Sequence, residues 1–138
     1  MSKKLPVLLA VLALVASSLA CAALGGDPTL SNTRTALDQD GNQTTSVFSP
    51  SDTIYVVNDL ANGVKGNLVN SSWYAADVEG VDANFLIDTV EYTVVDDTFD
   101  GTVHFFFEPP DGGWPPGTYR VEVFFNGAAS ATVEFTVQ

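Results

Sequence analysis

The sequence has one cysteine and one histidine among its 138 residues. A single cysteine excludes a disulfide within the chain, so packing alone must hold the fold together. With one histidine, a metal site would have to be built from carboxylates. No Gly-x-Ser-x-Gly nucleophile elbow is present. These absences argue against an enzyme, and we expect no cofactor.

Basic residues are also scarce. Five Lys and Arg stand against seventeen Asp and Glu, a formal charge of −12. Lys3 and Lys4 lie at the very start, and without them three basic residues against seventeen acidic ones leave −14. Such a chain repels phosphate backbones, which excludes nucleic-acid binding through a basic patch. The acidity is typical of a solvated surface.

The N-terminus has the layout of a secretory signal peptide over residues 1–20. "MSKK" is positively charged, Leu5 to Ala16 is an apolar run, and "SSLAC" brings small residues to Cys21. This last stretch resembles the lipobox of bacterial lipoproteins. The resemblance implies cleavage before Cys21, a lipid on Cys21, and a protein tethered to the outside of the cytoplasmic or outer membrane.

Two alternatives to lipidation stay open. Cleavage after Ala20 by ordinary signal peptidase would give a secreted protein. Leu5 to Leu24 has no charged residue, so it could instead span a bilayer as an uncleaved signal anchor. The lysines would then stay on the cytoplasmic side.

Residues 21–46 are predicted to be a flexible tether, because they are polar and show no sustained apolar period. Within them, "DQDGN" (38–42) invites comparison with a calcium loop. A calcium-binding EF-hand loop has Gly at its sixth position and Glu at its twelfth. Neither alignment of this segment, one starting at Asp38 and one that places Gly41 sixth, supplies both residues. A polar turn is therefore the better interpretation.

From residue 47 onward the apolar period changes to two. Six segments are rich in Val, Ile, Thr and aromatic residues and are separated by Gly, Asn, Asp or Pro. They are 53–60, 67–75, 84–95, 102–108, 118–126 and 131–137, and the third is long enough to be two strands split near Asp88. We expect an all-β antiparallel sandwich of six or seven strands over 47–138.

The stretch "WPPGTYRVEVFFNG" (114–127) predicts a turn, a strand and a hairpin turn. Tyr119, Val121 and Val123 fall on one face, and Asn126-Gly127 is the strongest short hairpin signal. "GTYRV" resembles the tyrosine corner of immunoglobulin-like sandwiches, with Val121 where antibody domains have cysteine. Trp73 matches their buried tryptophan. Together these features resemble the immunoglobulin-like or fibronectin-type modules of bacterial surface lipoproteins.

Other residues are weaker candidates for a site. His104 is expected to be an ordinary surface residue, and Asp96, Asp97 and Asp100 an acidic hairpin turn with weak potential for calcium. Trp114 is either an exposed ligand contact or a cap on the open end of the sandwich. Phe105, Phe106 and Phe107 indicate a strand that is buried on both faces or has a sticky face, with Phe106 as a candidate partner contact.

The sequence therefore predicts a membrane-tethered, non-enzymatic binding or structural module with a possible protein partner at the cell surface. The alternative is an accessory domain that binds carbohydrate or calcium.

Overall fold

The computed structural model of the protein describes residues 26–138. The predicted signal peptide (1–20) and Cys21 lie outside the described residues. No residue from 26 to 138 is helical, so none belongs to a helix that could cross a membrane. The strands are β1 (Thr29–Ala36), β2 (Val47–Phe48), β3 (Ile54–Val64), β4 (Leu68–Val78), β5 (Phe85–Thr93), β6 (Thr98–Phe107), β7 (Gly117–Phe125) and β8 (Ala128–Val137).

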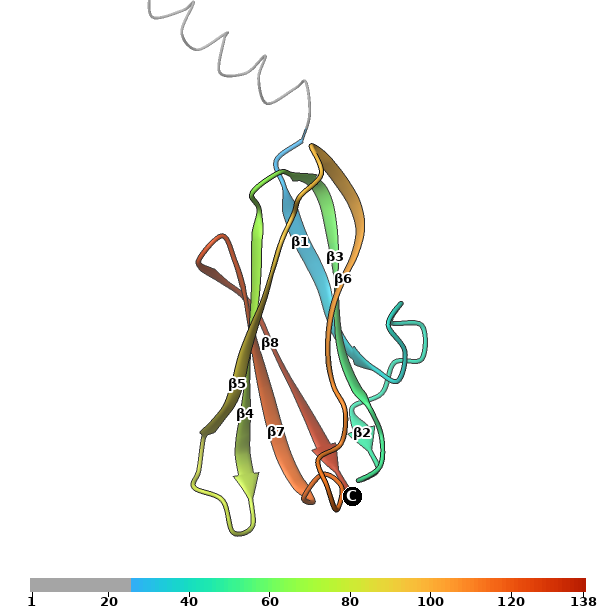
Figure 1. Cartoon of the computed structure of the whole chain (residues 1–138), viewed down its shortest axis with the longest axis vertical. Coiled ribbons are helices and arrows are strands. Elements are labelled where there is room, and N and C mark those ends of the chain that lie inside the picture. Colours follow the sequence, from blue (N-terminus) through green and yellow to red (C-terminus); the bar gives the residue numbers. More distant parts are fainter. Residues whose placement is uncertain (1–25) are drawn as a thin grey trace, which may run out of the picture.

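The strands form two sheets that pack face to face (Figure 1). The first sheet has the order β1-β3-β6, with antiparallel neighbours. The second has the order β2-β8-β7-β4-β5 and is antiparallel except where the short β2 runs parallel to β8. The predicted all-β sandwich is confirmed, and each of the six predicted segments overlaps one strand, while β1 and β2 were not predicted.

The core between the sheets is rich in aromatic rings. Trp73 is 1% exposed, and its ring meets that of Phe107 edge-on at 4.8 Å between centroids. Phe135 lies 6.1 Å from Trp73 and stacks on Tyr119 at 5.1 Å. Val121, at the position of the antibody cysteine, is fully buried. Offset and edge-on aromatic pairs of this kind add to the burial energy, which here replaces a disulfide.

The turn between β7 and β8 has the predicted geometry. Asn126 and Gly127 have φ values of 50° and 83°, and a type I′ hairpin needs positive φ at both of its central residues. The Asn126 side chain also accepts a hydrogen bond of 2.9 Å from the backbone N–H of Leu68. The hairpin is thereby fastened to the start of β4.

The prediction that residues 21–46 form a flexible tether is wrong for the part that the structure describes. β1 lies within this range and pairs with β3 from Thr29↔Ala61 to Ala36↔Tyr55. β1 is an edge strand with one solvated face, and its sequence "TLSNTRTA" has few apolar residues. The weak apolar pattern hid the strand, and the folded domain begins near Thr29 rather than at residue 47.

The segment 84–95 contains one strand, and the expected split near Asp88 is a bulge. Trp73 pairs with Asp88 and Tyr74 with Leu86, so Ile87 is an extra residue in β5. The expected acidic hairpin turn is also corrected. β5 and β6 belong to different sheets, so Asp96 and Asp97 lie on a connection that crosses the sandwich, and Asp100 lies within β6.

Candidate binding site along strand β6

Phe106 lies on the outward face of the first sheet and is 48% exposed. Its ring is 5.5 Å from that of Tyr55 on β3 and 6.3 Å from that of His104, and Tyr55 and His104 are 6.2 Å apart. Phe105 faces the core and is buried. The strand is therefore not buried on both faces. Its outward face has an exposed aromatic cluster, formed by Tyr55, His104 and Phe106.

The aromatic cluster lies on a strand whose outer edge is unpaired among the described residues. β6 ends the order β1-β3-β6, so one row of its backbone N–H and C=O groups faces away from the sheet. Edge strands are commonly protected from pairing by charged side chains. β6 has no Asp, Glu, Lys or Arg between Gly101 and Phe107, whereas β5, the edge of the other sheet, has Asp88 and Glu91.

A pocket of about 220 Å³ opens beside this edge. It is lined by Tyr92 of β5 and by Phe99, Thr102, Val103 and His104 of β6. Side chains from both faces of β6 line it, so it lies at the edge of the strand rather than over one face. The pocket therefore lies next to the unpaired backbone N–H and C=O groups of β6.

His104 lies on the exposed face, as predicted, among aromatic neighbours. The three aspartates do not converge into a metal cage. The Asp100 carboxylate accepts a hydrogen bond of 2.8 Å from the backbone N–H of Asn62, and Asp96 and Asp97 are exposed on the crossing connection. Within residues 26–138, no three His, Cys, Asp or Glu side chains lie close enough together to hold a metal ion.

Trp114 is 6% exposed, so its ring is not an exposed stacking platform, although it lines a pocket of about 200 Å³. Its indole N–H donates to the carbonyl oxygen of Asp52 at 2.9 Å, and its ring packs edge-on against Tyr119 at 5.8 Å. The exposed-contact interpretation of Trp114 is therefore wrong. Trp114 instead caps the end of the sandwich, which is the alternative interpretation.

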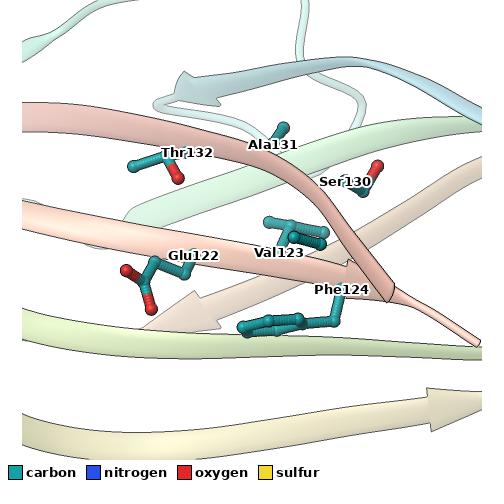
Figure 2. Close-up of a pocket in the computed structure, with 7 residues that line it drawn as sticks. Glu122, Val123, Phe124, Ser130, Ala131 and Thr132 are labelled. Carbon is teal, nitrogen blue, oxygen red and sulfur yellow. The ribbon is translucent and has the colours of Figure 1, made fainter. Parts of the chain in front are cut away.

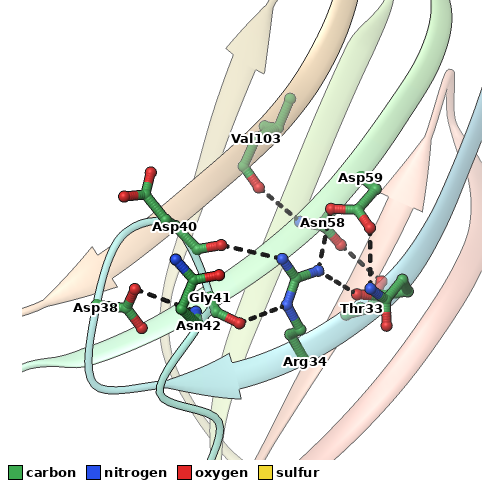
Figure 3. A network of polar contacts seen from close by, with 10 residues as sticks. Thr33, Arg34, Asp38, Asp40, Gly41, Asn42, Asn58, Asp59 and Val103 are labelled. Carbon is green, nitrogen blue, oxygen red and sulfur yellow. Dashed lines mark hydrogen bonds and ion pairs between the residues drawn. The ribbon is translucent and has the colours of Figure 1, made fainter.

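A polar network around Arg34 was not foreseen from the sequence (Figure 3). The guanidinium donates to the carbonyl oxygens of Asn32, Asp40 and Gly41 at 2.8–3.1 Å and to the Asp59 carboxylate at 3.1 Å. Asn32 also donates to Asp59, and these hydrogen bonds hold the pKa of Asp59 below its usual value. The network fastens the loop after β1 to β3.

The "DQDGN" segment is a closed polar turn, as predicted. Both oxygens of the Asp38 carboxylate accept backbone N–H groups, from Asn42 at 3.1 Å and from Gln43 at 2.8 Å. The bond from Gln43 is the main cause of the lowered pKa of Asp38. Gly41 has a φ of 70°, and a Cβ there would lie 2.5 Å from the Arg34 side chain. The turn thus uses its own carboxylate to hold itself.

A hollow of about 460 Å³ lies on the outer side of the β7–β8 hairpin (Figure 2). Val123 pairs with Ala131 and Phe124 with Ala129, so Ser130 is an extra residue that bends β8 away from β7. Phe124 is the only aromatic residue in the lining, which comes from this one hairpin. The hollow lies at the bulge, and its polar lining residues are Glu122, Ser130 and Thr132.

No family model matches the sequence, and no curated protein matches it either. Among solved structures, the chain is similar to an immunoglobulin-like protein from Pseudomonas aeruginosa, with a TM-score of 0.51 and 13% identity. The match covers 83% of this chain and 98% of that one. The chain is an immunoglobulin-like β-sandwich.

Two larger proteins contain similar regions. A β-glucosidase from Erythrobacter marinus matches with a TM-score of 0.52 and 12% identity, over 81% of this chain and 15% of that chain. An alkylpurine DNA glycosylase from Pseudomonas fluorescens matches with a TM-score of 0.49 and 13% identity, over 83% of this chain and 31% of that chain. The chain thus spans less than a third of either protein. At 12% identity the likeness to the β-glucosidase shows the fold alone.

Proposed function

We propose that this protein is a non-enzymatic module, held outside the cytoplasm at a membrane, that binds an extended segment of a partner protein along β6. The exposed aromatic cluster beside an unpaired edge that has no charged side chain from Gly101 to Phe107 is the observation that carries the proposal. In strand addition, main-chain hydrogen bonds supply affinity and pockets for alternate side chains supply specificity. β6 combines an unpaired edge, the outward ring of Phe106 and the adjoining pocket at Tyr92 and His104.

The tether in this proposal rests on the sequence of residues 1–21. The positive start, the apolar run and Cys21 supply export and a lipid anchor. A single acyl chain binds membranes only marginally, whereas a diacylglycerol on Cys21 supplies two chains and a stable anchor. The folded domain begins near Thr29, so only a short stretch separates Cys21 from β1. The module would therefore work close to the membrane surface.

A protein partner fits the aromatic cluster better than a carbohydrate does. The rings of Tyr55, His104 and Phe106 are tilted by 30–54° relative to one another. Side chains of a partner strand can pack on top of the exposed, tilted rings, as rings pack edge-on against one another in the core.

Site-specific photo-crosslinking in cells tests this function. A photoreactive residue replaces Thr102, which is exposed on β6, or Thr132, which is exposed on β8 of the other sheet. We expect a discrete protein adduct from position 102 and none from position 132. Adding Phe106→Ala to the position 102 probe should weaken the adduct about tenfold, since burying such a ring is worth roughly 1.5–3 kcal/mol.

Two results would count against the proposal. Equal adducts from positions 102 and 132 would mean that β6 is no special surface. A position 102 adduct that is unchanged by Phe106→Ala would mean that the aromatic cluster does not contact the partner. An adduct to polysaccharide instead of protein would favour the carbohydrate alternative.

A further inference from the structure

A second surface lies at the end of the sandwich opposite residue 26, where β6 runs into the loop that leads to β7 (Figure 1). Here the loop between β4 and β5 and the proline-rich loop between β6 and β7 enclose a pocket of about 200 Å³. Its lining is apolar and includes Val78, Val81, Phe85, Ile87, Pro110 and Pro115. Phe85 is 52% exposed, so the apolar lining reaches the surface of the protein.

The pocket offers no polar handle to a ligand. Tyr119 and Trp114 also line it, but both of their donors are already used. The Tyr119 hydroxyl donates to the carbonyl oxygen of Pro115 at 2.6 Å, and the Trp114 indole donates to that of Asp52 at 2.9 Å. A group that enters this pocket must therefore be apolar, because a polar group would lose its hydrogen bonds to water without replacement.

The size of the pocket points to one side chain. Small-molecule sites occupy roughly 300–1,000 Å³, and this pocket is smaller. A single aromatic or aliphatic side chain is the largest apolar group that it can take up whole.

The two loops that enclose the pocket are acidic. Glu79 and Asp82 lie on the first loop, and Glu108 and Asp111 lie on the second. All four are exposed and lie within two residues of a lining residue, and neither ion pair among the described residues involves them. Exposed carboxylates on neighbouring loops sum to a field that attracts cations, and Arg120, which donates to Asn84 of the first loop at 2.7 Å, offsets only part of it.

From these features we infer that the pocket receives an apolar side chain carried on a cationic segment of another protein. The charge of the chain disfavours the other occupants. A second copy would bring a net negative surface against the same four carboxylates. An anionic lipid surface would be repelled for the same reason. The inference concerns the pocket and not the outer edge of β6, and its test uses a different probe and different variants.

Peptide titration monitored by methyl NMR tests this inference. The full chain is held on nanodiscs of neutral lipid, and the probe is a pentapeptide with phenylalanine between two pairs of lysines. We expect the methyl signals of Val78, Val81 and Ile87 to shift. The methyl signals of Val64, the last residue of β3, lie at the opposite end of the sandwich from the pocket and should not shift. A peptide with alanine for the phenylalanine should bind about tenfold more weakly.

Matched variants separate the pocket from general charge attraction. Val81→Phe fills the pocket from its partly exposed rim and should abolish the shifts, whereas Val95→Phe adds the same ring at a 70% exposed position and should not. Glu79→Gln with Asp82→Asn should weaken binding of the peptide by about threefold, because it removes two of the four carboxylates that attract the lysines. Asp96→Asn with Asp97→Asn removes the same charge at the far end and should have little effect.

Two results would overturn the inference. One is equal binding of the phenylalanine and alanine peptides, which would mean that no side chain enters the pocket. The other is peptide binding that shifts only methyls outside the pocket, or that survives Val81→Phe.

Discussion

The hydroxyl of Tyr119 donates a 2.6 Å hydrogen bond to the carbonyl oxygen of Pro115, four residues earlier in the chain. Burial of this side chain raises the pKa of the phenol above its usual value. Pro115 and Pro116 have no N–H groups, so the carbonyls of this loop need partners from outside it. The bond closes the loop between β6 and β7 onto the start of β7, which is the predicted tyrosine corner.

Removing this hydroxyl should destabilise the protein without changing its fold. Tyr119→Phe keeps the ring stacked on Phe135 and leaves the Pro115 carbonyl unpaired, so we expect a loss of about 1–1.5 kcal/mol in the free energy of unfolding. Tyr119→Ala also removes the packing of the ring and should cost about 3–5 kcal/mol. Urea unfolding followed by circular dichroism measures both. A Phe variant as stable as the wild type would show that the corner contributes nothing.

Much of the fold could be predicted because most strands alternate between a buried and a solvated face. The alternation of Tyr119, Val121 and Val123 with polar neighbours marked β7, and Asn126-Gly127 marked its hairpin. β1 was not predicted, because it is an edge strand with few apolar residues and shows no clear alternation. The order of the strands could not be predicted, since nothing in the sequence indicates that the connection at Asp96 and Asp97 crosses from one sheet to the other.

Trp73 should be the single most sensitive core position. Its ring contacts Phe107 and Phe135, and its indole N–H donates to the Ser71 hydroxyl at 3.0 Å. Trp73→Ala should cost about 3–5 kcal/mol and, without a disulfide, can prevent folding. Trp73→Phe serves as the milder comparison where the alanine variant cannot be purified. In the wild type, acrylamide should quench both tryptophans poorly, and strong quenching of Trp73 would contradict its place in the core.

The Asp59 contacts predict a loss of stability in acid. The lowered pKa of Asp59 means that its charged form is stabilised by folding. This contribution is present at neutral pH and is lost as the pH falls below about 4 and through the lowered value. Because the pair with Arg34 is partly exposed, we expect Asp59→Asn to cost less than about 1 kcal/mol at pH 7.

The gap between wild type and Asp59→Asn should close as the pH falls, which urea unfolding at a series of pH values measures. Asp97→Asn is the control, because it removes a charge that is exposed and outside the network. If the gap stays constant from pH 7 to acid, the Arg34 network does not act through the charge of Asp59.

Calcium should have little effect on stability. Asp100 is engaged by the backbone of Asn62, and Asp96 and Asp97 lie on a different segment, so no set of 6–8 oxygen ligands converges there. We expect millimolar calcium to raise the melting temperature by less than about 5 °C, the shift that a 1 kcal/mol effect would give. A larger rise that is abolished by Asp96→Asn with Asp97→Asn would establish a site that the aspartates build only when calcium is bound.

The candidate binding site could be predicted only in part. Three consecutive phenylalanines place one ring on each face of a strand in turn, which identified Phe106 as a candidate contact. The sequence could not show that β6 is an edge, because that depends on which strands pair. It also could not distinguish an exposed Trp114 from a buried one, since the carbonyl of Asp52 that receives its N–H is 62 residues away.

Cys21 is predicted to carry the lipid that holds the module at the membrane. Cys21→Ser removes the only thiol in the chain, so the precursor should accumulate uncleaved and labelled fatty acid should no longer be incorporated. Leu19→Ala is a matched control that keeps the thiol and the apolar run. A wild-type protein that takes up no label and is recovered from the medium would favour secretion after cleavage at Ala20. A protein that takes up no label but stays uncleaved in the membrane would favour the signal anchor, in which Leu5 to Leu24 spans the bilayer.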